Sequence, residues 1–209
     1  MGRQENLEIF EDTVHLYNTN EYLRKSIERS TKEEEFYSGE KSIVRDEKRI
    51  YEKDARIIIS QKRSMEAASY YARENKKVCV LNFASATNPG GGVTNGSSAQ
   101  EEAICRVSTL FPCLNERKMM KCFYYPHRDA RDPLHNDDAI YTPNVVVFKS
   151  DTSYPRLLSE DKWYEVNVIT SAAPNLRQNP SNSMNSGDGY KRAEISKENL
   201  LVLLEKRIH

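Results

Sequence analysis

The sequence lacks an excess of either charge and any long apolar stretch. Its 209 residues carry 31 basic and 31 acidic side chains, so we expect no overall electrostatic attraction to a polyanion. No segment approaches 18 consecutive apolar residues, and no hydrophobic core follows the first residues, which argues against a membrane-spanning helix and a secretory signal. The expected protein is cytoplasmic, without membrane attachment and without direct nucleic-acid binding.

Recognisable metal-binding spacings are also missing. The four cysteines show no C-x-x-C spacing and the four histidines form no H-E-x-x-H pattern, so no metal and no cofactor is predicted. Such thiols are expected to be reduced and mainly buried. His127 and His135 lie among Arg and Asp side chains, and a polar surface loop is favoured there over a metal site.

Glycine is scarce, and half of the eight glycines fall between positions 90 and 96. Residues 88–92 read Asn-Pro-Gly-Gly-Gly, and after seven further residues positions 100–102 read Gln-Glu-Glu. Glycine has no side chain and accepts positive φ, so main-chain N–H groups of such a loop can approach a polar ligand closely. Two adjacent carboxylates just beyond the loop are what acid/base chemistry on that ligand requires.

The flanks of this segment predict a strand before it and a helix after it. Residues 77–83 are rich in β-branched and apolar side chains, and residues 103–111 have apolar positions at helical spacing. Ser98 precedes Glu101 by three residues, which predicts a capping box at the helix start. A helix N-terminus offers unpaired N–H groups and a partial positive charge, which suit an oxygen-rich ligand.

Each part of the motif also has a simpler interpretation. Glu101 as a helix cap, Glu102 as a solvated first-turn acid and the glycines as a tight turn would need no ligand. On a helical wheel both glutamates fall outside the apolar stripe, which suits solvent as well as a cleft. The combination of both motifs at one spacing favours a ligand site.

The remaining pattern alternates helices with strands, which predicts an α/β layered fold. Leu7, Phe10, Val14 and Tyr17 form the apolar stripe of a first helix, and Ser64 is the predicted cap of a later one. The other expected elements are a helix at about 21–29, a charged irregular run at 30–51, strands at 57–59, 145–148 and 164–170, a polar loop at 175–190, and an apolar helix at 198–208.

With these residues the chain resembles the catalytic domain of microbial-type poly(ADP-ribose) glycohydrolases, a macrodomain with added helices. The resemblance rests on the glycine loop with Gln-Glu-Glu and on segments 81–86, 132–148 and 168–175. It implies an α/β, macrodomain-like, three-layer mixed sheet with helices on both faces. The implied division is an N-terminal helical extension at 1–55 and a catalytic domain at 56–209. The resembled family continues into another strand and a second glycine-rich loop, so a C-terminal truncation with the last strands missing is expected.

The resemblance also implies a function. It is that of a glycosidase that hydrolyses ribose–ribose O-glycosidic bonds of poly(ADP-ribose) and releases ADP-ribose. Glu102 would be the catalytic acid/base, and Glu101 would orient the ribose through its hydroxyls. The implied substrate-binding residues are Asn88, Gly90, Gly91, Gly92 and Gln100, the last holding the loop or the neighbouring carboxylate. Implied partners are poly(ADP-ribose) or ADP-ribose and an ADP-ribosylated protein.

Three other functions stay open at this point: a non-catalytic ADP-ribose-binding macrodomain, a mono-ADP-ribosyl hydrolase and an inactive truncated remnant. Glycoside cleavage needs a carboxyl group that is protonated near neutral pH. Repulsion between Glu101 and Glu102 favours that protonation, while the helix N-terminus opposes it, and the sequence leaves the balance open.

Overall fold

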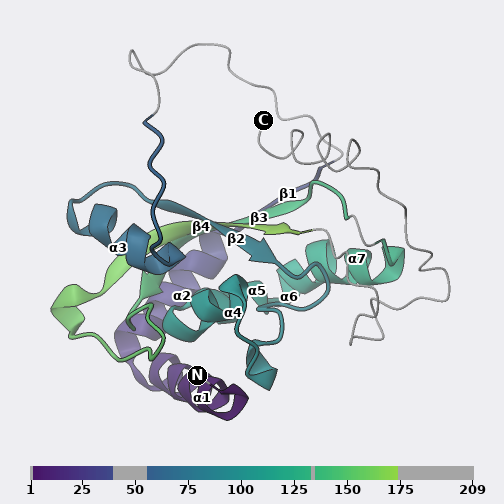
Figure 1. Cartoon of the computed structure of the whole chain (residues 1–209). Coiled ribbons are helices and arrows are strands. Elements are labelled where there is room, and N and C mark those ends of the chain that lie inside the picture. Colours follow the sequence, from purple (N-terminus) through teal and green to yellow (C-terminus); the bar gives the residue numbers. More distant parts are fainter. Residues whose placement is uncertain (1, 40–55, 133–134, 174–209) are drawn as a thin grey trace.

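The structure of the protein, a computed structural model, describes residues 2–39, 56–132 and 135–173 and has a mixed α/β architecture (Figure 1). In chain order its elements are α1 (Arg3–Thr19), α2 (Glu21–Glu33), β1 (Glu35–Tyr37), α3 (Ser64–Arg73), β2 (Cys79–Ala84), the 3-10 turn η1 (Val93–Asn95), α4 (Gln100–Val107), α5 (Leu110–Leu114), α6 (Arg117–Met119), a π-helical segment (Met120–Tyr124), α7 (Tyr125–Ala130), β3 (Ala139–Val147), a 3-10 turn (Glu160–Lys162) and β4 (Tyr164–Ala172). The predicted macrodomain-like α/β class is confirmed.

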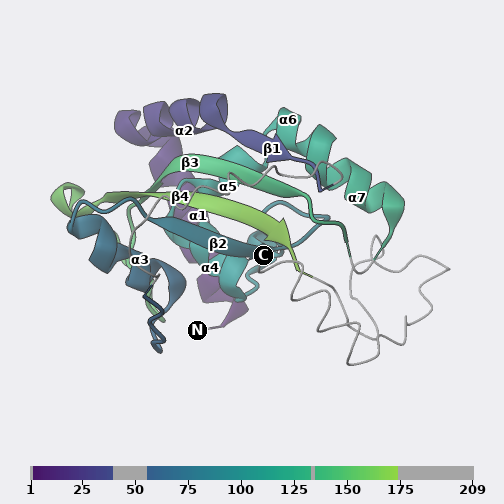
Figure 2. The same ribbon diagram turned by 90° about the horizontal axis from the view of Figure 1, so that it is seen from above.

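The four strands form one mixed sheet in the order β1-β3-β4-β2, viewed from above in Figure 2. β2 runs parallel to β4, whereas β3 is antiparallel to both β1 and β4. Side chains alternate between the faces, so Val80, Asn82 and Ala84 of β2 point into the core while Leu81 and Phe83 are exposed.

Helices α1, α2, α4 and α5 lie on the core side of the sheet, and α3 lies beside the β2 edge (Figures 1 and 2). The main apolar cluster joins these layers through Ile104, Leu110 and Phe123, which are fully buried. No described helix covers the opposite face at Leu81 and Ile169, which are 47% and 38% exposed, so the helical layer that the resemblance implies on this face is not among the described residues. Within the described residues no helix is both long and apolar enough to span a membrane.

A bulge in β3 fastens α2 to the sheet. The ladder between β3 and β4 shifts between Thr142 and Val145, where Pro143 has no N–H to donate and Asn144 takes a φ of 56°. The Asn144 carbonyl then accepts a hydrogen bond of 3.1 Å from the hydroxyl of Ser30 on α2.

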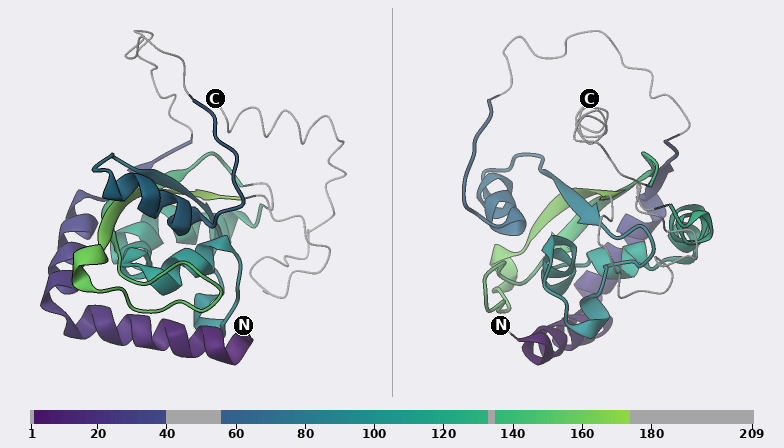
Figure 3. Two further views of the ribbon diagram at one scale, coloured as in Figure 1. Left: turned by 60° about the vertical axis from the view of Figure 1, so that its left-hand side comes forward. Right: turned by 45° about the vertical axis from the view of Figure 1, so that its right-hand side comes forward.

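Helix α1 braces the glycine loop and α4 (Figure 3, where it runs along the base of the molecule). The buried Asn6 side chain donates to the Gly96 carbonyl at 2.9 Å, and the Thr13 hydroxyl donates to the Arg106 carbonyl at 2.6 Å. Gly96 has a φ of +70°, and a Cβ there would lie 2.1 Å from the Arg3 carbonyl oxygen. Only glycine therefore permits α1 to pass this close to the end of the loop.

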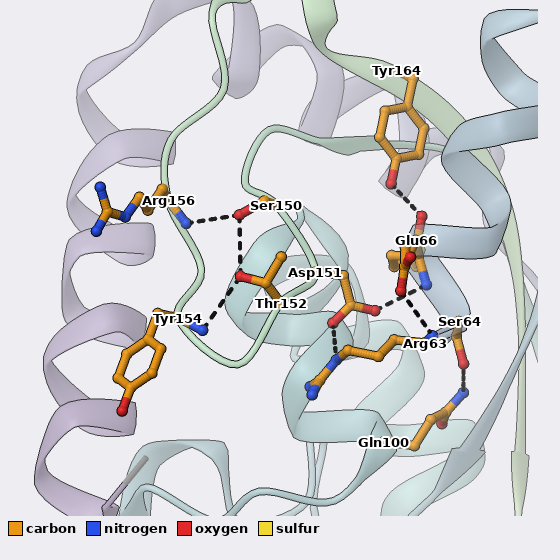
Figure 4. Close-up of polar contacts among 11 residues, drawn as sticks. Arg63, Ser64, Glu66, Gln100, Ser150, Asp151, Thr152, Tyr154, Arg156 and Tyr164 are labelled. Carbon is orange, nitrogen blue, oxygen red and sulfur yellow. Dashed lines mark hydrogen bonds and ion pairs between the residues drawn. The ribbon is translucent and has the colours of Figure 1, made fainter. Parts of the chain in front are cut away.

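An acidic side chain from a distant loop caps α3 (Figure 4). The predicted cap, Ser64, is the first helical residue, and Arg63 occupies the cap position without a side-chain cap bond. Instead Asp151 accepts hydrogen bonds from the Met65 N–H at 3.0 Å and from Arg63 Nε at 2.7 Å. The helix start therefore depends on a contact across 86 residues of sequence, which local spacing does not reveal.

Three further expectations are corrected. The strand at 57–59 is wrong: the segment forms no strand, and Ile57 and Ile59 are 87% and 94% exposed, because β-branched residues need a neighbouring strand to pair with. The run at 30–37 is not irregular, since it completes α2 and forms β1. The buried face of α1 includes Asn6 and Thr13 besides Phe10 and Tyr17, because both polar side chains find hydrogen-bond partners; Leu7 and Val14 are half-buried.

The loop predicted at 175–190, the helix predicted at 198–208 and most of the charged run at 30–51 lie outside the described residues. The division of the chain at residues 55 and 56 stays a prediction.

The contact between α1 and the loop predicts the effect of Asn6→Ala. The substitution leaves the buried Gly96 carbonyl without its donor, so the free energy of unfolding should fall by about 1 to 3 kcal/mol. Urea unfolding followed by circular dichroism measures the change. Gln4→Ala, at an exposed position of the same helix, is the matched control and should stay within about 0.5 kcal/mol of wild type. Equal effects of the two substitutions would contradict the bracing role of α1.

Candidate active site

Helix α4 begins directly after the glycine loop, but not with the predicted capping box. Its cap position is Ala99, which has no side-chain cap bond, so Ser98 does not cap the helix. Glu101 Oε2 instead accepts a hydrogen bond of 2.7 Å from the N–H of Ser85, the residue after β2. The carboxyl group turns toward the end of the strand because the Ser85 N–H is available there as a donor.

The glycine loop packs directly against both carboxyl groups. Gly90 and Gly91 have φ values of +68° and +60°, a region that side chains disfavour. A Cβ on Gly91 would lie 2.6 Å from Glu102 Oε1 and 2.9 Å from Glu101 Oε2. The N–H of Gly92 donates to Glu102 Oε1 at 2.9 Å. Both predicted acids therefore face the loop, and the absence of side chains at the glycines is what lets them do so.

Both glutamates are buried, with Glu101 3% and Glu102 7% exposed. The helical wheel was compatible with both side chains pointing to solvent or into a cleft. The structure shows that neither side chain points to solvent. Glu101 Oε1 and Glu102 Oε2 are buried without a hydrogen-bond partner in the described part of the chain. Because buried polar atoms are normally hydrogen-bonded, this pair of oxygens suits a ligand that brings hydroxyl groups.

Burial changes the protonation of Glu101. It raises the pKa of Glu101 from 4.5 to about 8, the N–H of Ser85 opposes this, and the charge of Glu102 adds to it. Glu101 thus holds a proton near neutral pH. The sequence left open whether repulsion between the acids or the helix N-terminus decides the protonation of this residue. In the structure Glu101 is protonated, and removal of its carboxyl group from water raises its pKa more than repulsion by Glu102 does.

Gln100 contacts the edge of β2. Its side-chain amide donates to the Leu81 carbonyl at 2.8 Å and to the Ser64 hydroxyl at 3.2 Å, and it accepts from the Phe83 N–H at 3.0 Å. Figure 4 shows the bond to Ser64. Gln100 therefore ties α4 to β2 and α3, not to the glycine loop or a carboxylate. A contact between Gln100 and substrate stays a prediction.

Asn88 opens the bend of the loop. Its N–H donates to the Ser85 hydroxyl at 3.1 Å, and its carbonyl accepts from the Gly91 N–H at 2.9 Å. The structure thus brings Asn88, the three glycines, Glu101 and Glu102 together at one end of β2.

Sequence reasoning missed three residues of this region: Ser85, Asn82 and Arg106. Asn82 is fully buried and donates to the Thr170 hydroxyl at 3.2 Å, and Arg106 is 2% exposed. Signals in the sequence could have found two of the three. Asn82 is a polar residue at an inward position of an alternating strand, and Arg106 interrupts an apolar helical stretch.

His127 is not in a surface loop, because it lies on α7 and is 5% exposed. Its ring nitrogens contact the Phe123 carbonyl at 2.7 Å and the Asn136 side chain at 2.9 Å. Within residues 2–39, 56–132 and 135–173, no three His, Cys, Asp or Glu side chains gather as a metal site. The four cysteines are free thiols; Cys105 and Cys113 are buried, and Cys79 is exposed.

Comparison with known families decides what this arrangement belongs to. The model of the family described as microbial-type PARG, catalytic domain, matches residues 3–150, where PARG is poly(ADP-ribose) glycohydrolase. The chain belongs to this family. The motif of glycine loop and Gln-Glu-Glu lies inside the matched range, so the resemblance stated from the residues is confirmed.

Solved PARG structures share the fold. The enzyme from Thermomonospora curvata has a TM-score of 0.74 at 29% identity, over 98% of this chain and 73% of that chain. The same enzyme bound to the inhibitor ADP-HPD gives 0.71 at 28%, over 98% and 72%. PARG from Deinococcus radiodurans in complex with ADP-ribose gives 0.55 at 31%, over 71% and 52%. No curated protein matches the chain.

The raised pKa of Glu101 predicts a pH-dependent stability. Because the pKa in the folded state lies above the ordinary 4.5, the stability that this residue contributes is full below about pH 4.5 and is lost as pH rises through about 8. Glu101→Gln does not titrate, so its melting temperature relative to wild type should rise between pH 5 and pH 9. Thermal unfolding at pH 5, 7 and 9 measures this.

Glu28→Gln, an exposed change of the same kind on α2, is the control and should follow the wild-type curve. If Glu101→Gln also runs parallel to wild type across this range, the carboxyl group of Glu101 is not protonated near neutral pH.

Proposed function

We propose that the chain is a glycosidase that hydrolyses the ribose–ribose O-glycosidic bonds of poly(ADP-ribose) and releases ADP-ribose. One observation carries the proposal: two buried glutamates lie against a side-chain-free bend, and each has one buried carboxyl oxygen without a hydrogen-bond partner in the described residues. Membership of the PARG family supports the reaction, and complexes of related PARG proteins with ADP-ribose and ADP-HPD support the ligand.

The two acids take different parts in the proposed reaction. Glu101, protonated at rest, binds a hydroxyl of the ribose and orients the sugar. Glu102 is the acid/base. The bound diphosphate adds negative charge beside the pair, which favours a second proton, and that proton loads Glu102 in the complex. Asn88 and Gly90–Gly92 contact the terminal ribose, where the glycines allow the sugar to approach main chain.

In the cleavage step Glu102 first donates a proton and then accepts one. Glu102 gives its proton to the leaving ribose oxygen as the glycosidic C–O bond breaks through an oxocarbenium-like state. A water molecule adds to the anomeric carbon, and Glu102, now a carboxylate, takes a proton from it. The products are ADP-ribose and a polymer with a free hydroxyl, and Glu102 is again protonated.

The charge of the site bears on the choice between an enzyme and a binding module. The ligand is anionic, and two buried acids that face it oppose binding unless one of them supplies a proton. A module that only holds ADP-ribose gains nothing from this pair. With a net charge of zero, recognition rests on local contacts beside the side-chain-free bend and on the N-terminus of α4, not on the overall field.

The acid/base assignment predicts the effect of Glu102→Gln. Loss of the proton donor should lower the release of ADP-ribose from labelled poly(ADP-ribose) by about 10²- to 10⁴-fold, while ADP-ribose binding stays. Chromatography of the released label and calorimetric binding measure the two effects. Glu28→Gln is again the matched control. A wild-type chain that binds ADP-ribose without releasing it from polymer is a binding module. A wild-type chain that acts only on mono-ADP-ribosylated protein is a mono-ADP-ribosyl hydrolase.

The close approach of the loop predicts the effect of Gly91→Ala. The new methyl group would meet Glu102 Oε1 at 2.6 Å in a backbone conformation with a φ of +60°, so the carboxyl group must move. We expect turnover of the polymer to fall by at least about 10-fold. Gly2→Ala is the control, because the nearest atom to its Cβ, at 3.8 Å, is at ordinary contact distance. An active Gly91→Ala enzyme would show that the loop does not set the position of Glu102.

A further inference from the structure

Arg106 carries a buried charge for which the reaction described above has no use. It lies on α4 one turn after Glu102, is 2% exposed and is among the largest fully buried side chains of the described residues. Burial of a guanidinium group is unfavourable unless the group is paired and hydrogen-bonded. The burial of the Arg106 guanidinium group beside the site therefore has to be offset by specific interactions.

Hydrogen bonds connect Arg106 to Glu102 in a closed ring. Arg106 Nη1 donates to the Ser97 carbonyl at the end of the glycine loop. The Ser97 N–H donates to the Gly92 carbonyl at 3.1 Å, and the Gly92 N–H donates to Glu102 Oε1 at 2.9 Å. Glu102 and Arg106 close the ring because they stand on the same helix. A shift of Arg106 thus displaces the peptide that directs the Glu102 carboxyl group.

The charges around the guanidinium group support the same link. Glu102 precedes Arg106 by four residues, which is the favourable order for an acid and a base on a helix. Burial lowers the pKa of Arg106, and the negative charge of Glu102 opposes this effect. Cys105, Arg63 and Asp151 are the other ionisable groups that act on it. Arg63 and Asp151 pair with each other at 2.7 Å, which leaves Glu102 as the charge that Arg106 balances at the site.

We propose that Arg106 is a positioning residue of the glycosidase site, which holds the Ser97 end of the glycine loop and balances the charge of Glu102. The inference rests on the proposed function and deepens it. Arg106 fixes Glu102 Oε1 on the Gly92 N–H, so that Oε2 is the oxygen directed to the substrate. Arg106 itself does not touch the substrate.

Kinetics of Arg106→Met and Arg106→Lys test the proposal. Arg106→Met keeps the length of the side chain but loses the charge and the donors. We expect its kcat to fall by about 10- to 100-fold, with KM for poly(ADP-ribose) nearly unchanged. Its pH–rate profile should move to higher pH, because a positive charge beside Glu102 is lost. Arg106→Lys restores the charge, so its pH–rate profile should return toward wild type and its kcat should recover in part.

Arg63→Met is the matched control, since it removes a guanidinium group from the same cluster that has no bond to the glycine loop. It should lower the melting temperature and leave kcat and the pH–rate profile as in wild type. A folded Arg106→Met enzyme with wild-type kcat and pH–rate profile would overturn the proposal. So would a loss of kcat without a change of profile. If Arg106→Met does not fold, Arg106→Lys alone decides through its kcat, which should still lie below wild type at unchanged KM.

Unfolding separates this inference from the proposed function. The decrease in urea midpoint caused by an Arg106 substitution should be smaller in the Glu102→Gln background than in wild type, because the charge that Arg106 balances is then absent. Equal decreases would show that the two residues are not coupled. This measurement needs no turnover, so a chain without glycohydrolase activity still tests the link between Arg106 and Glu102.

Discussion

The contact between the main chain at Gly91 and Gly92 and the carboxyl groups of Glu101 and Glu102 constrains the rest of the site. Two acids can be buried beside each other only if backbone N–H groups donate hydrogen bonds to the carboxyl oxygens and a proton neutralises part of the charge. The Gly92 N–H serves Glu102, the Ser85 N–H serves Glu101, and burial holds a proton on Glu101. A side chain at Gly91 would occupy the space that this arrangement needs.

Much of the surrounding structure keeps that contact in place. Asn6 of α1 holds the end of the loop, and Gln100 ties the start of α4 to β2 and α3. Asp151 caps α3 from the loop after β3. These contacts come from α1, the start of α4 and the loop after β3, which are far apart in the sequence. The N-terminal helix, which the sequence suggests as an appendage, thereby contributes to the rigidity of the site.

The order of elements around the site was predictable. The strand at 77–83, the glycine loop and the helix after it appear in the structure as β2, the bend and α4, within two residues of the expected bounds at the strand. The predictions failed where pairing decides. Residues 57–59 have strong β propensity but form no strand. Ser98 has the spacing of a capping box with Glu101, but the Glu101 carboxyl group accepts a hydrogen bond from the Ser85 N–H instead. Propensity and spacing are properties of one segment, whereas both outcomes depend on contacts with another segment of the folded chain.

By itself the sequence determined the class of fold, the glycine-bearing bend and the presence of two acids just after it, because hydrophobic period and glycine content act locally. Only the tertiary structure decided that both acids are buried, that Glu101 holds a proton near neutral pH, and that Gln100 contacts β2. It also decided that Arg106 is linked to Glu102 through Ser97 and Gly92. These properties depend on atoms from β2, α1 and the loop itself, which come together only in the folded chain.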